Sequence, residues 1–499
     1  MEGVMERSSG ILMAISSLPS EHGIGTFGRA AYDFADFLAA SGQKYWQMLP
    51  LGPVSYGDSP YQSFSSYAGN PYYIDLELLK EDGLLTDEEI SSCDWGEDSR
   101  YVDYGKIYEN RFRILKLAAD RGYERDLKQV EIFIRDNTWL GDYTLFMACK
   151  RHFGMKSWLE WPDEDIKMRR SDAIARCRAE FAEDIRLFTY IQFLFFKQWG
   201  DLKDYIHSKG IKIIGDIPIY VALDSVDVWS EPRQFELDDD LYPVEVAGCP
   251  PDDFATDGQL WGNPLYDWEY MKNDGFGWWI RRIDGVAKHF DVIRIDHFRG
   301  LDEYWAVPYG AENARGGIWR QGPGISLIKV LNTWFSDTMY IAEDLGFLTP
   351  TVHKLVKDSG WPSMKVLEFA FDSKEPSDYL PHRFNGNCVC YTGTHDNETL
   401  MQWKENADPE DIKMAVRYLN LTEEEGFNWG MIRGGMSSVA DLFIAPLQDY
   451  LGLGGEARMN RPSDPQGWWR WRCRPQDIKG DEAGKLAERI REMTDLYGR

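Results

Sequence analysis

Residues 291–300, with the sequence DVIRIDHFRG, place three reactive side chains at the end of an apolar run. Arg294 and Asp296 are two residues apart, so on a strand their side chains face the same way, and His297 follows directly. A neighbouring cation favours the ionised, nucleophilic form of a carboxylate. The stretch could therefore present a carboxylate nucleophile, although an Arg–Asp pair can also simply close a turn.

Three further acids stand where apolar runs end: Asp216 in GDIPI, Glu343 in AEDLG and Asp396 in THDN, the last preceded by His395. Each alone is typical of a helix N-cap. Together they allow two chemistries, because carboxylates with histidines can bind a divalent metal and paired carboxylates can cleave a glycosidic bond. Arg294 favours the second, since a guanidinium in the cluster would repel a metal ion.

The elements that must position these acids are short apolar runs, which predict buried parallel strands. Helical patterns separate them, such as residues 349–360, which open with Thr-Pro and close with Gly. This alternation predicts an α/β protein, and eight strands predict a (β/α)8 TIM barrel with its chemistry at the carboxyl ends of the strands. The eight runs are residues 10–18, 45–52, 211–221, 292–298, 339–346, 364–372, 388–396 and 439–447.

Two long intervals interrupt the alternation. Residues 80–200 have helical patterns without an evident strand, which predicts a large, mostly helical insertion between the second and third strands. Residues 222–285 are aromatic and rich in Gly, Pro and Asp, and a loop of that length is usually functional. We interpret it as a lid over the active site, and residues 1–499 as a single catalytic barrel that carries both insertions.

Composition narrows the class of partner. The net charge of -27 over 499 residues disfavours nucleic acid and anionic membranes, but permits a neutral ligand. No stretch approaches the ~20 apolar residues of a membrane span. The seven cysteines show no zinc-ligand spacing, so we expect free thiols, no metal and a cytoplasmic location. The 20 Trp and 26 Tyr gather partly in polar, Gly- and Pro-rich segments, where aromatic faces suit sugar rings.

At these residues the sequence resembles the 4-α-glucanotransferases, also called amylomaltases or disproportionating enzymes, which form glycoside hydrolase family 77 of the α-amylase clan. The blocks that carry the resemblance follow the family order along nearly the whole chain. They are GQKYWQMLPLGPVSYGDSPYQSFSSYAGNPYYIDL, GDIPIYV, AGCPPDDFATDGQLWGNPLYDW, VIRIDHFRG, IAEDLG, YTGTHDNET and PLQDYLGLGGEARMN.

The resemblance implies a role for each matching residue. Asp296 would be the nucleophile, Glu343 the general acid/base, and Asp396 a third acid that holds the hydroxyls of the glucose at the cleavage point. Asp216 would be a structural acid bonded to Arg294. The further residues expected to bind substrate are Tyr61, which would stack on a sugar ring, and Trp261, Arg294, His297, Asp372, His395 and Asn460.

The implied reaction is transfer of an α-1,4-glucan segment to the 4-hydroxyl of glucose or another maltooligosaccharide, through a covalent glycosyl-enzyme and without a cofactor. The segment 247–268 would keep water away from that intermediate. One departure lies there, because Asp253 stands where relatives commonly have a tyrosine. The alternatives are a retaining α-1,4-glucan hydrolase, which would share the acids, and a non-catalytic glucan-binding protein, which would not need them.

Overall fold

The computed structural model describes residues 6–251, 256–346, 348–462, 464 and 467–499. Eight parallel strands close into a barrel in the order β1-β12-β11-β10-β9-β6-β3-β2, which confirms the predicted TIM barrel. Each of the eight apolar runs overlaps one strand. The strands are β1 (Ser8–Leu12), β2 (Tyr45–Gln47), β3 (Lys212–Pro218), β6 (Val292–Asp296), β9 (Met339–Ala342), β10 (Ser363–Val366), β11 (Cys388–Tyr391) and β12 (Leu442–Pro446).

The register of β3, β6 and β9 sets the layers of the barrel interior. Asp216 on β3 lies opposite Arg294 on β6, and Arg294 lies opposite Ile341 on β9. Neighbouring Gly215 points outward, where an added Cβ would lie 2.2 Å from the ring of Phe290. The glycine therefore lets the helix layer approach β3 closely and leaves the Asp216 side chain facing inward.

Helices surround the barrel and follow its strands, as the alternation predicts. The helix predicted at 349–360 begins after the capping side chain of Thr349 and ends at Gly360, whose φ is 76°. These helices are α1 (Arg29–Ala40), α12 (Gly277–Ala287), α13 (Ile325–Trp334), α14 (Pro350–Ser359), α15 (Leu400–Asn406), α16 (Pro409–Leu419), α17 (Phe427–Met436), α18 (Leu447–Leu451), α19 (Pro475–Ile478) and α20 (Asp481–Leu496).

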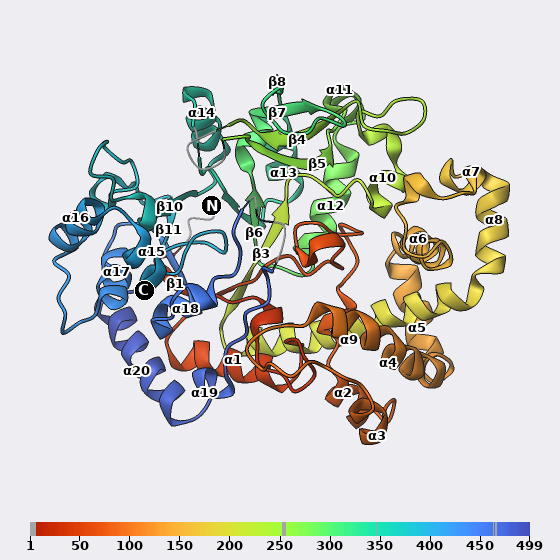
Figure 1. Cartoon of the computed structure of the whole chain (residues 1–499), viewed down its shortest axis with the longest axis horizontal. Coiled ribbons are helices and arrows are strands. Elements are labelled where there is room, and N and C mark those ends of the chain that lie inside the picture. The colour runs from red at the N-terminus through yellow and green to blue at the C-terminus, as the bar shows by residue number, and fades with distance from the viewer. Residues whose placement is uncertain (1–5, 252–255, 347, 463, 465–466) are drawn as a thin grey trace.

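The chain between β2 and β3 is helical and gathers at one side of the barrel, in orange and yellow (Figure 1). The 27-residue helix α9 contacts α4, α5, α6 and α8 within this group and α1 of the barrel, so it joins the two parts. The helices are α2 (Leu76–Glu81), α3 (Asp87–Ser91), α4 (Tyr104–Arg125), α5 (Leu127–Asp136), α6 (Leu140–His152), α7 (Glu164–Lys167), α8 (Ser171–Glu180) and α9 (Ala182–Ser208).

A second, antiparallel sheet is a feature that the sequence did not predict. Its order is β5-β4-β7-β8, with β4 (Glu245–Cys249), β5 (Gln259–Pro264), β7 (Glu303–Pro308) and β8 (Ile318–Gln321). Residues 222–285 are therefore more than the expected loop, and they also contain α10 (Val226–Ser230) and α11 (Trp268–Asn273). The sequence indicates this sheet only weakly for two reasons. Strand β4 pairs with β7, which comes after β6 in the chain, and every residue of β8 is exposed, so β8 lacks an apolar run.

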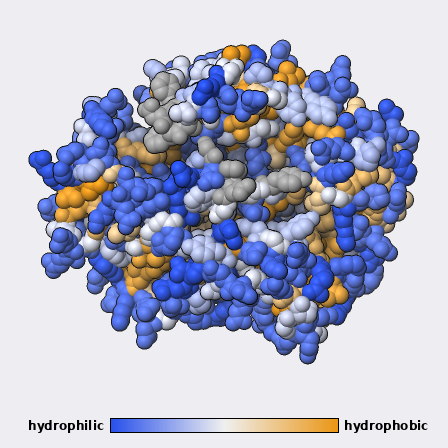
Figure 2. Space-filling view, in the orientation of Figure 1, coloured by the Kyte–Doolittle hydropathy of each residue, from blue (hydrophilic) through white to orange (hydrophobic). Residues whose placement is uncertain are grey.

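The surface is mostly hydrophilic on the face shown in Figure 2. Hydrophobic residues gather on that face only in separate patches. None of the described helices has the length and apolar character needed to cross a bilayer. No disulfide joins any of the seven cysteines, all of which lie among the described residues.

Candidate active site

Two of the predicted acids lie where neighbouring strands β6 and β9 end. Asp296 is the last residue of β6, and Glu343 directly follows β9. Three hydrogen bonds donated by backbone N–H groups connect the ends of β6 and β9. The N–H of His297 donates to Glu343 Oε2 at 2.6 Å, the N–H of Phe298 donates to the Glu343 carbonyl at 3.0 Å, and the Glu343 N–H donates to the Ile295 carbonyl at 3.2 Å. The two carboxylates are therefore held at one end of the barrel by shared backbone bonds.

His297 adopts the left-handed conformation, with φ 52° and ψ 45°. This region is uncommon for a residue other than glycine and has a free-energy cost, so it persists only where the surroundings enforce it. Here the backbone turns sharply away from the strand immediately after Asp296, and the same peptide unit donates to Glu343. The left-handed conformation of His297 thus accompanies the hydrogen bond from its N–H to Glu343.

Arg294 binds two acids at once. Its Nη1 donates to both oxygens of Asp216, at 2.7 and 2.6 Å, and to Asp296 Oδ1 at 2.9 Å. The side chains of Arg294 and Asp216 are 3% and 0% exposed, whereas that of Asp296 is 26% exposed. Tyr61 completes the group, because its hydroxyl donates to Asp216 Oδ2 at 2.7 Å. Asp216 therefore anchors the guanidinium, and Asp296 remains open to a ligand.

The protein shifts the pKa values of the two carboxyls to different extents. Desolvation raises the pKa of Asp296 to about 6, although Arg294 lowers it. Arg294 thus favours the ionised form, as expected, but desolvation has the larger effect and leaves the pKa above its usual range. Desolvation also raises the pKa of Glu343, to about 8, again against Arg294. Between these values Asp296 is ionised and Glu343 is protonated, which pairs a nucleophile with a proton donor.

The third acid, Asp396, follows β11 in a loop and is held by side chains from two segments. Asn460 Nδ2 donates to its Oδ1 at 2.6 Å, His395 Nε2 lies 3.3 Å from Oδ2, and Arg458 donates to its carbonyl at 2.9 Å. Desolvation raises the pKa of Asp396, but the lowering by His395 and Asn460 together is larger, so the pKa falls to about 2. Asp396 is therefore an ionised acceptor at any working pH.

Aromatic side chains border the acids. The ring of Tyr61 stacks on His395 with centroids 4.9 Å apart, and Trp469 lies 5.8 Å from each of them. Trp261 packs edge-on against His297 at 4.7 Å. Aromatic faces next to carboxylates and imidazoles match a ligand with apolar C–H faces and many hydroxyls.

The structure brings ten of the eleven predicted site residues into one connected set of contacts and leaves Asp372 apart. Asp372 is exposed and accepts hydrogen bonds from the N–H groups of Lys374 and Glu375, so its described bonds are local. Asp253 lies outside the described residues. The connected residues are Tyr61, Asp216, Trp261, Arg294, Asp296, His297, Glu343, His395, Asp396 and Asn460.

Sequence reasoning missed Arg458 and Trp469 as members of the site. Trp469 lies in the aromatic segment GWWRWR and has a φ of 66°, but nothing in the sequence indicates that it reaches Tyr61. Arg458 donates to the carbonyls of both Asp396 and Asn460, which only the folded chain brings together. Both arrive from the segment that follows β12.

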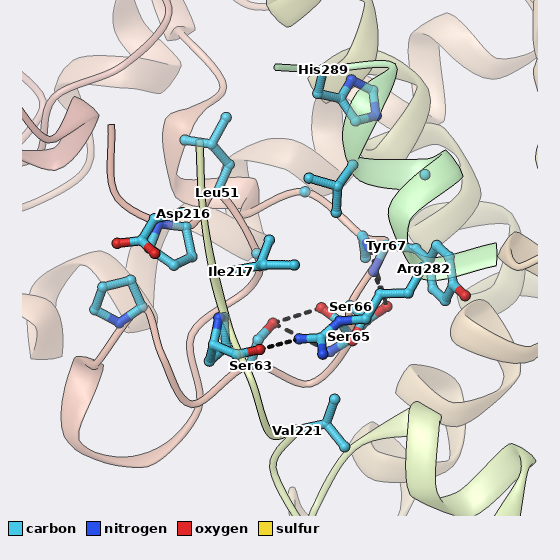
Figure 3. A pocket seen from close by; sticks show the side chains of 18 of the residues that line it. Leu51, Ser63, Ser65, Ser66, Tyr67, Asp216, Ile217, Val221, Arg282 and His289 are labelled. Atoms are coloured by element: carbon cyan, nitrogen blue, oxygen red, sulfur yellow. Dashed lines mark hydrogen bonds between the residues drawn. The ribbon is translucent and has the colours of Figure 1, made fainter. Parts of the chain in front are cut away.

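A cavity of about 90 Å³ has Tyr61 and Asp216 in its lining. Figure 3 shows Asp216 and Arg282 among the residues that line it. Its lining includes Ser66, Arg282 and His289, and the three acids Asp296, Glu343 and Asp396 are not part of it. Within this lining, Asp227 accepts a hydrogen bond from the Ser66 N–H at 2.8 Å. This cavity therefore adjoins the carboxylate site at Tyr61 and Asp216 but does not include the three acids.

The donor set does not fit a metal ion. Within the described ranges, no group of three or more His, Cys, Asp or Glu side chains is arranged to hold one. Arg294 occupies the position between Asp216 and Asp296 that a cation would need. The arrangement instead fits acid-assisted displacement at a carbon centre by a carboxylate.

Comparison with known proteins identifies relatives over nearly the whole chain. The family model described as 4-alpha-glucanotransferase matches residues 13–477. The 4-alpha-glucanotransferase of Clostridium butyricum is 48% identical over 490 residues, 98% of this chain and 100% of that protein. That of Thermus thermophilus is 43% identical over 495 residues, 97% of this chain and 98% of that protein. The structure of amylomaltase from Streptococcus agalactiae in complex with acarbose has a TM-score of 0.96 and 40% identity, covering 99% of this chain and 100% of that chain.

Proposed function

Because the chain belongs to the 4-alpha-glucanotransferase family and has that family's activity on α-1,4-glucans, we propose that Asp296 and Glu343 perform the transfer by a retaining double displacement. The observation that carries this proposal is the pairing of the two acids. They share backbone bonds at the ends of β6 and β9, and their pKa values of about 6 and about 8 leave one ionised and the other protonated near neutral pH.

In the first half of the reaction, a carboxylate oxygen of Asp296 attacks the anomeric carbon of the glucan. The bond from that carbon to the departing oxygen breaks, and Glu343 gives its proton to this oxygen. In the second half, Glu343 takes the proton of an acceptor 4-hydroxyl, whose oxygen displaces Asp296 from the anomeric carbon. Retaining enzymes keep the two carboxyl groups about 5–5.5 Å apart. Protons balance over the cycle, so we expect no cofactor.

The other site residues hold the sugar and the nucleophile. Asp396, ionised and fixed by Asn460 and His395, would accept hydrogen bonds from hydroxyls of the glucose at the cleavage point. The faces of Tyr61 and Trp261 would contact sugar rings. Arg294, anchored by Asp216, would orient Asp296, and His297 would contact the same glucose. A substrate contact by Asp372 stays a prediction from the resemblance.

The substrates that fit this site are maltooligosaccharides and longer α-1,4-glucans, with glucose as an acceptor. A relative with 40% identity is an amylomaltase in complex with acarbose, and we infer that acarbose binds this site too. The segment 222–285, with β4 and β5, would act as the lid that admits a sugar and excludes water. We also propose a cytoplasmic location, which suits seven cysteines that form no disulfide.

A product profile tests this function. The protein is incubated with maltotriose and the products are separated by length over time. We expect glucose together with chains longer than the substrate, and we expect Asp296→Asn and Glu343→Gln to abolish both. If only glucose and maltose form, with one new reducing end per cleavage, the reaction is hydrolysis and the proposed role of the lid is wrong.

A further inference from the structure

The loop that carries Asp396, residues 392–400, is held by buried groups on its inner side; we call it the Asp396 loop. Asp449 on α18 fixes both ends, because its Oδ2 accepts from the Thr392 hydroxyl at 2.6 Å and its Oδ1 accepts from the Leu400 N–H at 2.8 Å. Arg458 binds the middle through the Asp396 carbonyl at 2.9 Å. The position of Asp396 thus depends on groups that do not touch the sugar.

Glu368 lies against the same loop and has no role in the mechanism above. It follows β10 in a short 3₁₀ turn and is 7% exposed. Its backbone N–H donates to the Thr392 carbonyl at 3.3 Å, and the backbone N–H of Glu398 lies near enough to its carboxyl to lower the carboxyl pKa. Its Oε1 lies so near Gly393 that an added Cβ there would be 2.7 Å away. Glu368 therefore contacts the Asp396 loop on both sides of Asp396.

The surroundings of Glu368 favour a carboxyl that stays protonated. Desolvation raises its pKa well above the usual range, and Asp449 and Glu398 raise it further, while Arg458 opposes them. Its Oε1 is buried and has no hydrogen-bond partner among the described residues. An ionised Glu368 would add a third negative charge beside Asp449 and Glu398, which would disfavour the packed position of the loop.

We propose that Glu368 is a positioning residue that fixes the Asp396 loop and thereby sets where the Asp396 carboxylate meets the sugar. Glu368 follows β10 and the loop follows β11, which are paired in parallel. The contact therefore ties the loop that carries Asp396, after β11, to the end of the neighbouring strand β10. This inference rests on the proposed function of Asp396 as the acid that binds the glucose at the cleavage point.

Acarbose affinity, measured by titration calorimetry on the full chain, tests this inference. Glu368→Gln keeps an uncharged group and an oxygen near the Glu398 N–H, so we expect it to bind acarbose as the unaltered chain does. Glu368→Ala removes the support, and we expect affinity to fall by about tenfold to hundredfold, the scale of loss when a positioned group moves by about 1 Å. Gly393→Ala should lower affinity similarly, because its Cβ would lie 2.7 Å from Glu368 Oε1 and would push the carboxyl away from the loop without removing it.

A double-mutant cycle separates positioning from general stability. If Glu368 acts through Asp396, then Glu368→Ala in an Asp396→Asn background should change acarbose affinity by less than about twofold. Asp75→Asn is the matched control. Asp75 is also a buried carboxyl that accepts a backbone N–H, that of Leu78 at 3.0 Å, but it caps α2 and belongs neither to the proposed site nor to the lid, so acarbose affinity should not change.

Three results would overturn the inference. They are an unchanged acarbose affinity in both Glu368→Ala and Gly393→Ala, a loss in Glu368→Gln as large as in Glu368→Ala, and full additivity with Asp396→Asn. Failure of the proposed function would look different, because Asp396→Asn alone would then leave acarbose affinity intact. If Glu368→Ala does not fold, the Gln variant and Gly393→Ala still decide the outcome.

Discussion

Replacing Arg294 by methionine should move the pH dependence of transfer to higher pH. Its Nη1 lies 2.9 Å from Asp296 Oδ1 and also bonds both oxygens of Asp216. Arg294 lowers the pKa of Asp296, which desolvation nevertheless holds at about 6. Without the guanidinium, desolvation and Asp216 are opposed only by a weaker lowering from His395 among the described groups, and no arginine lies between Asp216 and Asp296. We therefore expect Asp296 to bind its proton more tightly.

The size of the shift follows from the contact. Two charges about 4 Å apart in an effective dielectric of about 20 interact by about 4 kcal/mol, which is an upper bound of about three pKa units. A nearby opposite charge typically shifts a carboxyl by about 1–3 units. We expect the acidic limb of kcat/KM to rise by one to two units from about 6. At pH 6 the ionised fraction of Asp296 should then fall from about one half to about one tenth or one hundredth, which lowers the activity by about fivefold to fiftyfold through ionisation alone.

The assay is the initial rate of glucose release from maltotriose between pH 4.5 and pH 9.5, with kcat/KM reporting the free enzyme. The alkaline limb, near the Glu343 pKa of about 8, should also rise, because Arg294 lowers that pKa as well. Apparent values belong to the coupled pair of acids rather than to either one. Urea unfolding at each pH accompanies the rates, since breaking a buried ion pair costs about 3–5 kcal/mol of stability.

Arg282→Met is the matched control for this experiment. Arg282 is also a buried arginine, but it donates to the carbonyls of Pro218 and Ile219 instead of to carboxylates. We expect it to reduce the free energy of unfolding without moving the acidic limb. The reasoning is refuted if Arg294→Met lowers activity equally at every pH and leaves the acidic limb near 6.

Further substitutions test the other contacts. Tyr61→Phe removes the hydroxyl bonded to Asp216 and keeps the ring on His395, so we expect a loss of about 1–3 kcal/mol in unfolding free energy with KM for maltotriose nearly unchanged. Trp261→Ala removes a ring that we propose contacts the sugar, and it should raise KM for maltotriose more than it lowers kcat. Chelators such as EDTA should leave the transfer rate unchanged, because Arg294 stands where a metal would bind; a loss restored by a divalent ion would contradict this. Acarbose binding should persist in Glu343→Gln while glucose release stops.

The barrel could be predicted because its strands are buried on both faces and therefore form continuous apolar runs. Asp296 and Glu343 could be found because they end such runs. The antiparallel sheet could not, since its strands are short and partly exposed and their pairing spans the β6 strand. The contacts of Arg458 and Glu368 could not be predicted either, because each contacts the loop around Asp396 from a segment distant in sequence.

The pKa values were equally inaccessible from the sequence. Arg294 beside Asp296 indicates a lowered pKa when only the neighbouring charge is considered. The folded chain adds desolvation, which acts in the opposite direction and dominates. Charge neighbours can be read from spacing on a strand, but desolvation depends on everything packed around the carboxyl.

The left-handed peptide after Asp296 has a consequence for redesign of this enzyme. One peptide unit ends the strand that carries the proposed nucleophile and donates its N–H to the proposed proton donor on the next strand. Any change that rotates this unit moves the Asp296 carboxylate and releases Glu343 in the same step. The two acids therefore cannot be tuned one at a time by altering the backbone between them. Variants selected for a different pH range or acceptor should instead accumulate changes around the side chains and leave the backbone at 296–298 unaltered.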